Sequence, residues 1–225
     1  MEETGLVIDK PEVPQTFHQL GILVLDGSHS MNDPANQGKS KAQDVQIAMK
    51  EMFNRFDASR VKNNFSFACV KFDTTASTSM ESTLFTDMDY FNEDFNPLSG
   101  KGGATYIHSG LSEAKEIAEN FLNSAPSGGV KHSVIILLMS DGMCHEPDKT
   151  KTAATELKNI DGVDLACAYF AKVGNNNAES GEIKNLLQEI ATNPVQYYTT
   201  VFTGDKLRDF FMNSISASVG IAKIG

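Results

Sequence analysis

Basic residues, long apolar runs and cysteines are scarce in this sequence, and each scarcity excludes a class of protein. The 19 lysines and arginines are outnumbered by 29 aspartates and glutamates, which leaves a formal net charge of −10 at pH 7. A chain this acidic is repelled by nucleic acid and by anionic membrane surfaces. No segment approaches the roughly 20 apolar residues that span a bilayer. We therefore expect neither a nucleic acid nor a membrane as a partner.

The N-terminus and the cysteines indicate a cellular compartment. Residues 1–15 contain neither a basic stretch nor an apolar core, so we expect no secretory signal. The three cysteines fit no even framework of disulfides, and Cys69 and Cys167 lie inside strand-like runs. We interpret them as small buried apolar residues of a reducing compartment. The sequence therefore predicts a cytoplasmic protein.

What the sequence does contain is a regular alternation of strand-like and helix-like segments. The strand-like segments are residues 21–25, 65–72, 132–139, 163–170 and 195–201, with a short edge strand over 76–85. The helix-like segments are residues 40–57, the stretch after Thr105, and residues 150–160, 181–191 and 205–219, with apolar side chains at helical spacing. Such alternation indicates βαβ units and a mostly parallel sheet.

We therefore predict an α/β fold of the Rossmann-like, doubly wound type. It has a mostly parallel sheet, helices on both faces and one antiparallel edge strand. The chain of 225 residues, 40% of them hydrophobic, is long enough for one substantial core. We expect a flexible N-terminal tail over residues 1–17 and a single domain over residues 18–225.

The stretch LGILVLDGSHSMND begins as a buried strand and ends in oxygen-bearing side chains. Asp26, Ser28 and Ser30 follow the apolar run at a spacing of two residues. Asp141 follows the most apolar of the strand-like runs, and Thr105 lies in a polar loop directly before a helix. Ligands of an open parallel sheet bind outside the carboxyl ends of its strands. We therefore expect these five side chains to converge at one edge of the sheet.

Two carboxylates and three hydroxyls form a set of oxygen ligands without thiolate or imidazole. Hard divalent cations prefer such ligands, and Mg²⁺ takes six of them at about 2.1 Å while usually keeping some waters. Five side chains leave a coordination position open, and a further carboxylate can complete the shell. The sequence therefore predicts a site for Mg²⁺ or Mn²⁺, with Ca²⁺ a weaker candidate.

This set of residues resembles a known metal site. The motif Asp26-x-Ser28-x-Ser30, the Thr105 loop and Asp141 of the SDG sequence are similar to the metal-ion-dependent adhesion site of the von Willebrand factor A family. All five expected positions are present in the expected order, and the resemblance covers nearly the whole chain. It implies that the three hydroxyls bind the metal directly or nearly so. It also implies that the two carboxylates act largely through water.

The resemblance implies a binding module and not an enzyme. The open position at the metal would accept a Glu or Asp side chain of a protein partner. The C-terminal sequence FFMNSISASV looks like the last helix of intracellular bacterial members, particularly those associated with tellurite resistance and stress-response operons. We therefore expect a role in a bacterial stress-response or regulatory assembly. Most members have glycine at the position of His29, which we interpret as a solvated side chain and not as a ligand.

Two other functions fit parts of the same pattern. A metal-dependent phosphatase or phosphotransferase can carry an Asp nucleophile at the first strand end, as Asp26 would. Enzymes of the haloacid-dehalogenase type, however, have a second acid two residues on, where Ser28 stands, and no lysine is well placed after the strand-like run 132–139. A metal site that serves only stability is the other alternative, and the sequence does not exclude it.

Two further motifs have ordinary structural explanations. Residues 33–40, DPANQGKS, miss the phosphate-binding loop pattern because Asp33 replaces the first glycine. Ser40 followed by Gln43 indicates instead a capping box at a helix start. Residues 86–96 are acidic and aromatic, but they lack the glycine and the final glutamate of an EF-hand loop. We expect a surface segment with its aromatic side chains turned inward.

Overall fold

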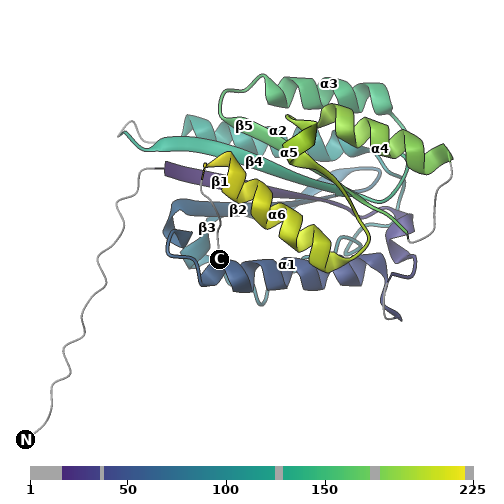
Figure 1. Ribbon diagram of the computed structural model, residues 1–225, viewed down its shortest axis with the longest axis horizontal. Helices are drawn as coiled ribbons and strands as arrows, with labels where there is room; N and C mark the ends of the chain where they lie inside the picture. Colours follow the sequence, from purple (N-terminus) through teal and green to yellow (C-terminus); the bar gives the residue numbers. More distant parts are fainter. Residues whose placement is uncertain (1–16, 36–37, 125–128, 173–177, 221–225) are drawn as a thin grey trace, which may run out of the picture.

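The centre of the computed structural model is a six-stranded sheet with the strand order β3-β2-β1-β4-β5-β6 and helices on both faces (Figure 1). The structure describes residues 17–35, 38–124, 129–172 and 178–220. Nearly all of the predicted N-terminal tail, residues 1–16, lies outside the described residues.

The elements alternate along the chain as the sequence predicts. The strands are β1 (Phe17–Asp26), β2 (Phe65–Phe72), β3 (Ala76–Leu84), β4 (Lys131–Ser140), β5 (Val163–Phe170) and β6 (Tyr198–Val201). The helices are α1 (Lys41–Asp57), α2 (Ile107–Asn123), α3 (Pro147–Lys158), α4 (Ala178–Ile190), α5 (Pro194–Tyr197) and α6 (Gly204–Ser218). Short 3₁₀ turns are η1 (His29–Asn32), η3 (Lys62–Asn64) and η4 (Phe85–Asp87). Neighbouring strands are parallel except β2 and β3, so the predicted fold class is confirmed.

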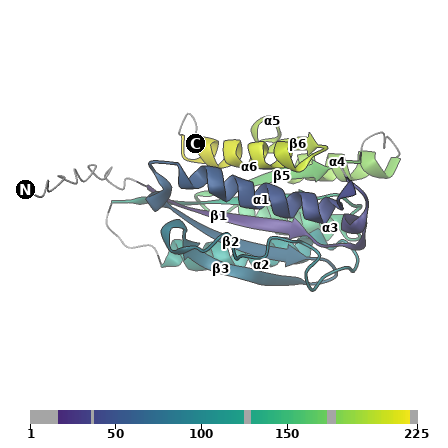
Figure 2. The ribbon, with the colours of Figure 1, turned by 90° about the horizontal axis from the view of Figure 1, so that it is seen from below.

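The helices form two layers around this sheet. Helices α1 and α6 pack together on one face, and α2, α3 and α4 cover the other, as Figure 1 and Figure 2 show. Arg208 of α6 donates a hydrogen bond to Glu51 of α1 and also pairs with Asp205 at 2.7 Å. This buried guanidinium ties α1 to α6.

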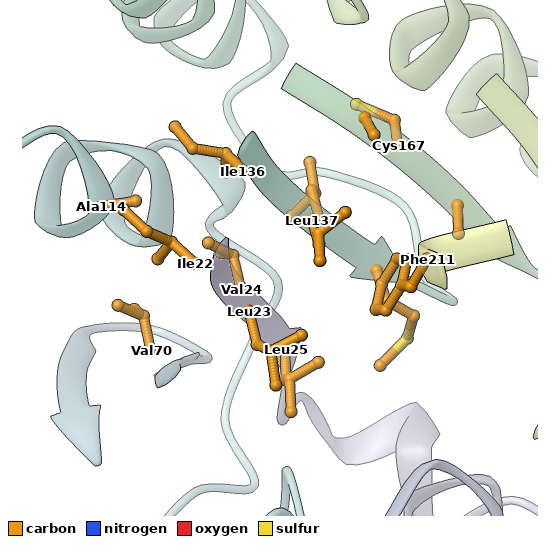
Figure 3. Close-up of a cluster of buried hydrophobic side chains, with 14 of the residues drawn as sticks. Ile22, Leu23, Val24, Leu25, Val70, Ala114, Ile136, Leu137, Cys167 and Phe211 are labelled. Carbon is orange, nitrogen blue, oxygen red and sulfur yellow. The ribbon is translucent and has the colours of Figure 1, made fainter. Parts of the chain in front are cut away.

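The two central strands are apolar because both of their faces are covered. All residues of β1 from 19 to 26 and of β4 from 133 to 140 are buried. Figure 3 shows Ile22 of β1 beside Ala114 of α2, with Phe211 of α6 on the other side of the sheet. Side chains alternate between the two faces along a strand, so each central strand contributes to both halves of the core.

The prediction of a last strand over residues 195–201 is wrong in its first half. Residues Pro194–Tyr197 form the short helix α5, and β6 is limited to Tyr198–Val201. The side-chain oxygen of Asn193 caps α5 by accepting a hydrogen bond from the amide of Val195 at 3.1 Å. Pro194 fits the first turn, where a missing N–H is no loss. The local cap therefore overrides the strand-like composition of this segment.

Other local predictions are confirmed, except that the inward position expected for the aromatic side chains of residues 86–96 is wrong for Phe91. The capping box of Ser40 and Gln43 begins α1, with both of its hydrogen bonds present. In the acidic segment 86–96, Tyr90 and Phe95 are buried as expected, whereas Phe91 is exposed. Within the described part of the chain, no helix combines the length and apolar character needed to cross a bilayer.

Candidate metal centre

The carboxyl ends of β1 and β4 meet at the centre of the sheet. The chain leaves β1 toward β2 on one side, whereas β4 leads toward β5 on the other, so this is the switch point of a doubly wound sheet, where ligands bind. Asp26 ends β1, and Asp141 directly follows β4. The hydroxyl of Ser140 donates to Asp26 Oδ2 at 2.5 Å and joins the two strand ends. Both aspartates are buried.

The loop after β1 folds back over these carboxylates. Asp26 Oδ1 accepts a hydrogen bond from the amide of Ser28 at 2.8 Å, and this contact directly precedes the turn η1. The hydroxyl oxygens of Ser28 and Ser30 then lie 3.1 Å apart, and Ser30 donates to Asp141 Oδ1 at 2.7 Å. Adjacent ligands of an octahedral ion with bonds of about 2.1 Å are separated by about 3.0 Å. The spacing of these oxygens therefore suits a small divalent cation.

The loop that carries Thr105 is held by the turn between β2 and β3. Asp73 Oδ2 accepts the amides of Gly102 and Gly103 at 3.1 and 3.0 Å. The hydroxyl of Thr74 accepts the amide of Ala104 at 3.1 Å. These three hydrogen bonds fix the backbone directly before Thr105.

Backbone hydrogen bonds also join the three loops of the site to one another. The amide of His29 donates to the carbonyl of Gly103, and the amide of His145 donates to the carbonyl of Thr105, both at 3.0 Å. The ring of His145 stacks on Tyr106 with a centroid separation of 5.3 Å. The hydroxyl of Thr105 therefore sits on a backbone that is restrained from both neighbouring loops.

Three hydroxyl oxygens of the predicted site lie around Gly142. A Cβ atom added to Gly142 would lie 3.1 Å from Ser30 Oγ and from Thr105 Oγ1, and 3.9 Å from Ser28 Oγ. The glycine thus lines a small cradle of hydroxyl oxygens, and a methyl group added there would press against those of Ser30 and Thr105. Within the residues that the structure describes, no group of three or more His, Cys, Asp or Glu side chains is arranged to hold a metal. A cation here would depend on hydroxyls as well as carboxylates.

The electrostatics of the site favour a bound cation. Burial, together with the negative charge of Asp141, raises the pKa of Asp26 to about 7 from an ordinary value of 3.8. Burial also raises the pKa of Asp141, although the positive charge of Lys41 opposes this. Two buried carboxylates are therefore held close together, and a divalent cation would stabilise their ionised forms. The residues present fit such an ion.

The five residues chosen from the sequence are thus brought together, and His29 is exposed, as expected for a solvated side chain. Three further residues, which the sequence did not predict, also shape the site. These are Ser140, which bonds Asp26, Asp73, which holds the Thr105 loop, and Lys41, whose ammonium donates to Asp141 Oδ2. A cation in the first turn of a helix opposes the helix dipole, which makes Lys41 unusual in the sequence but does not identify Asp141 as its partner.

The fold and the site together define a doubly wound α/β domain with an oxygen-lined candidate metal site at its switch point. The model of the von Willebrand factor type A domain matches residues 22–213. The chain therefore belongs to the von Willebrand factor type A domain family. No curated protein matches it.

Several solved structures share the fold at low sequence identity. The pilus adhesin SpaC from Lactobacillus rhamnosus GG has a TM-score of 0.70 at 14% identity, over 90% of this chain and 31% of its own. Proximal thread matrix protein 1 from the mussel byssus, in a structure with a zinc-occupied MIDAS motif, has a TM-score of 0.57 at 22% identity, over 90% and 46%. BatB from Bacteroides thetaiotaomicron has a TM-score of 0.59 at 18% identity, over 89% and 98%. The chain thus spans about a third of the adhesin and nearly all of BatB.

We predict that Asp26→Asn stabilises the chelator-treated protein at neutral pH. The folded protein holds the Asp26 proton more tightly than the unfolded chain does, because its folded-state pKa is raised to about 7. Ionisation of Asp26 therefore removes stability as the pH rises from about 4, the ordinary Asp value, through 7. The variant should have the same melting temperature as the wild type near pH 4 and a higher one above pH 7. The corresponding gain in unfolding free energy above pH 7 is on the order of a few kcal/mol. A difference that stays constant with pH would contradict this assignment.

We also predict that Gly142→Ala abolishes metal binding without unfolding the protein. The added methyl group would occupy the cradle between Ser30 and Thr105. Calorimetric titration of Mg²⁺ should show no saturable binding, whereas the melting temperature of the chelator-treated variant should stay close to that of the wild type. Gly181→Ala is the matched control, because its Cβ would meet no atom within 4 Å. Unchanged metal affinity in Gly142→Ala would place the metal elsewhere.

Proposed function

We propose that this chain is a divalent-metal-dependent protein-binding module. Ser28, Ser30 and Thr105 would hold Mg²⁺ or Mn²⁺ directly, and Asp26 and Asp141 would act largely through water. The bound metal supplies a Lewis-acidic position that an acidic side chain of a partner completes. The partner would therefore be a protein that presents Glu or Asp at its surface.

The observation that carries this proposal is the convergence of three hydroxyls on the Gly142 cradle, next to two buried carboxylates. Such carboxylates are expensive to bury unless they are paired or coordinate a metal. Hydroxyl ligands add no charge, so they do not offset the positive charge of a bound divalent cation. The similarity to a mussel matrix protein whose structure has a zinc-occupied MIDAS motif supports divalent metal binding at this kind of site.

The position of Asp26 argues against the phosphatase alternative. A nucleophilic carboxylate needs an oxygen that can reach the substrate. Asp26 is fully buried, and its two oxygens accept hydrogen bonds from Ser28 and Ser140. This burial supports a role for Asp26 in holding the loop and the proposed metal, and it does not favour attack on a phosphoryl group.

The cellular setting that we propose is cytoplasmic, in a bacterial stress-response or regulatory assembly of the kind associated with tellurite resistance. The three cysteines, Cys69, Cys144 and Cys167, are unpaired and buried, which supports a reducing compartment. The resemblance of the C-terminal segment to intracellular bacterial members is the other support. Localisation of the tagged chain after cell fractionation tests this setting directly, and recovery from the culture medium would contradict it.

We predict that the Thr105 hydroxyl contributes to the affinity for the metal. Calorimetric titration of Mg²⁺ and Mn²⁺ into the chelator-treated protein should show one ion per chain, and Thr105→Ala should weaken its affinity about tenfold or more, since one ligand is lost. Thr152→Ala is the control, because Thr152 lies exposed on α3 and bonds only to the carbonyl of Asp148. Equal affinity in the two variants would refute the assignment of Thr105. Mg²⁺-dependent hydrolysis of aryl phosphates that is lost in Asp26→Asn would refute the non-enzymatic function.

A further inference from the structure

Lys41 is a buried cation in direct contact with the candidate metal site. It is the first residue of α1, and it is only 4% exposed. Its ammonium donates to Asp141 Oδ2 and lies 3.9 Å from Asp33 Oδ2. Asp33 is exposed, so water screens the attraction between its carboxylate and the Lys41 ammonium. Asp141 is therefore the partner that balances the charge of Lys41.

The backbone around Lys41 gives its side chain little freedom to leave. The amide of Lys41 donates to the carbonyl of Asp33 at 3.0 Å. The capping box of Ser40 and Gln43 fixes the first turn of α1, and Arg208 ties the same helix to α6. A lysine in the first turn of a helix opposes the helix dipole, and burial of its ammonium is unfavourable without a partner. The fold therefore holds a positive charge at a place where it is locally unfavourable.

Lys41 changes the net charge of the metal site. Asp26 and Asp141 contribute two negative charges when ionised, and Lys41 contributes one positive charge. A divalent cation then leaves the site with a net charge of about plus one, and a carboxylate from a partner brings it to about zero. Without Lys41, the same metal would neutralise the site alone, and a carboxylate ligand would add an uncompensated negative charge.

We propose that Lys41 makes metal binding depend on an acidic ligand. It shares Asp141 with the metal and so weakens metal binding to the free protein, and its positive charge strengthens binding of a carboxylate to the metal-loaded protein. This inference rests on the proposed function. It makes Lys41 a positioning residue that determines specificity for acidic partners, and it predicts that the free chain and the partner-bound chain differ strongly in metal affinity.

The test is a set of calorimetric titrations of Mn²⁺ into the chelator-treated full chain. Each is made in saturating acetate, as the carboxylate probe, and in chloride at equal ionic strength. In the wild type, acetate should raise the affinity for Mn²⁺ about tenfold. Lys41→Gln keeps a hydrogen-bond donor but removes the charge, so its affinity in chloride should rise about tenfold and its response to acetate should disappear. Lys41→Arg keeps the charge and should keep the response.

The control is Lys62→Gln, which removes a lysine paired with Asp57 directly before the start of β2, at the amino end of that strand, and which should behave like the wild type. Wild-type binding of Mn²⁺ that does not respond to acetate would overturn the inference, whether or not the Lys41 variants fold. The same affinity and the same acetate response in Lys41→Gln as in the wild type would overturn it as well. No Mn²⁺ binding by the wild type in either buffer would instead overturn the proposed function itself.

Discussion

The structure depends on two carboxylates that are buried side by side at the switch point of the sheet. Asp26 and Asp141 end up together because β1 and β4 are parallel neighbours, and the register that pairs Leu25 with Met139 brings their carboxyl ends level. Ionised carboxylates in such a place destabilise a fold unless cations and hydrogen-bond donors surround them. The hydroxyls of Ser30 and Ser140, the amide of Ser28 and the ammonium of Lys41 are the donors that do so.

The rest of the molecule holds these donors in place. Helices on both faces make the central strands rigid, and Asp73 and His145 restrain the Thr105 loop from two sides. The site is therefore organised before any ligand arrives, which reduces the ordering entropy that binding has to overcome. The same organisation has a cost in stability: burial raises the pKa of Asp26, so ionisation of this carboxyl opposes folding. Function and stability are in conflict here, as is common at binding sites.

Much of this could be predicted from the sequence. The apolar runs that lead into Asp26 and Asp141 identify two central strands and their shared edge, and the loop before α2 identifies Thr105. Residues 195–197 were misjudged because the cap by Asn193 is a local hydrogen bond that composition does not reveal. Lys41 was missed for a different reason: it lies 100 positions from Asp141 in the sequence, so only the packing of α1 on the sheet brings the two together. Pairings of this kind depend on tertiary geometry and leave no spacing pattern.

The central claim is that one divalent cation binds among the hydroxyls beside Gly142. A crystal of the protein grown with Mn²⁺, measured for anomalous scattering, tests it most directly. We expect a single strong anomalous peak within coordination distance of Ser28, Ser30 and Thr105, at about 2.1–2.3 Å from their hydroxyl oxygens. A peak at another place on the chain, or an ordered side-chain cluster at this position with no anomalous signal at saturating Mn²⁺, would contradict it.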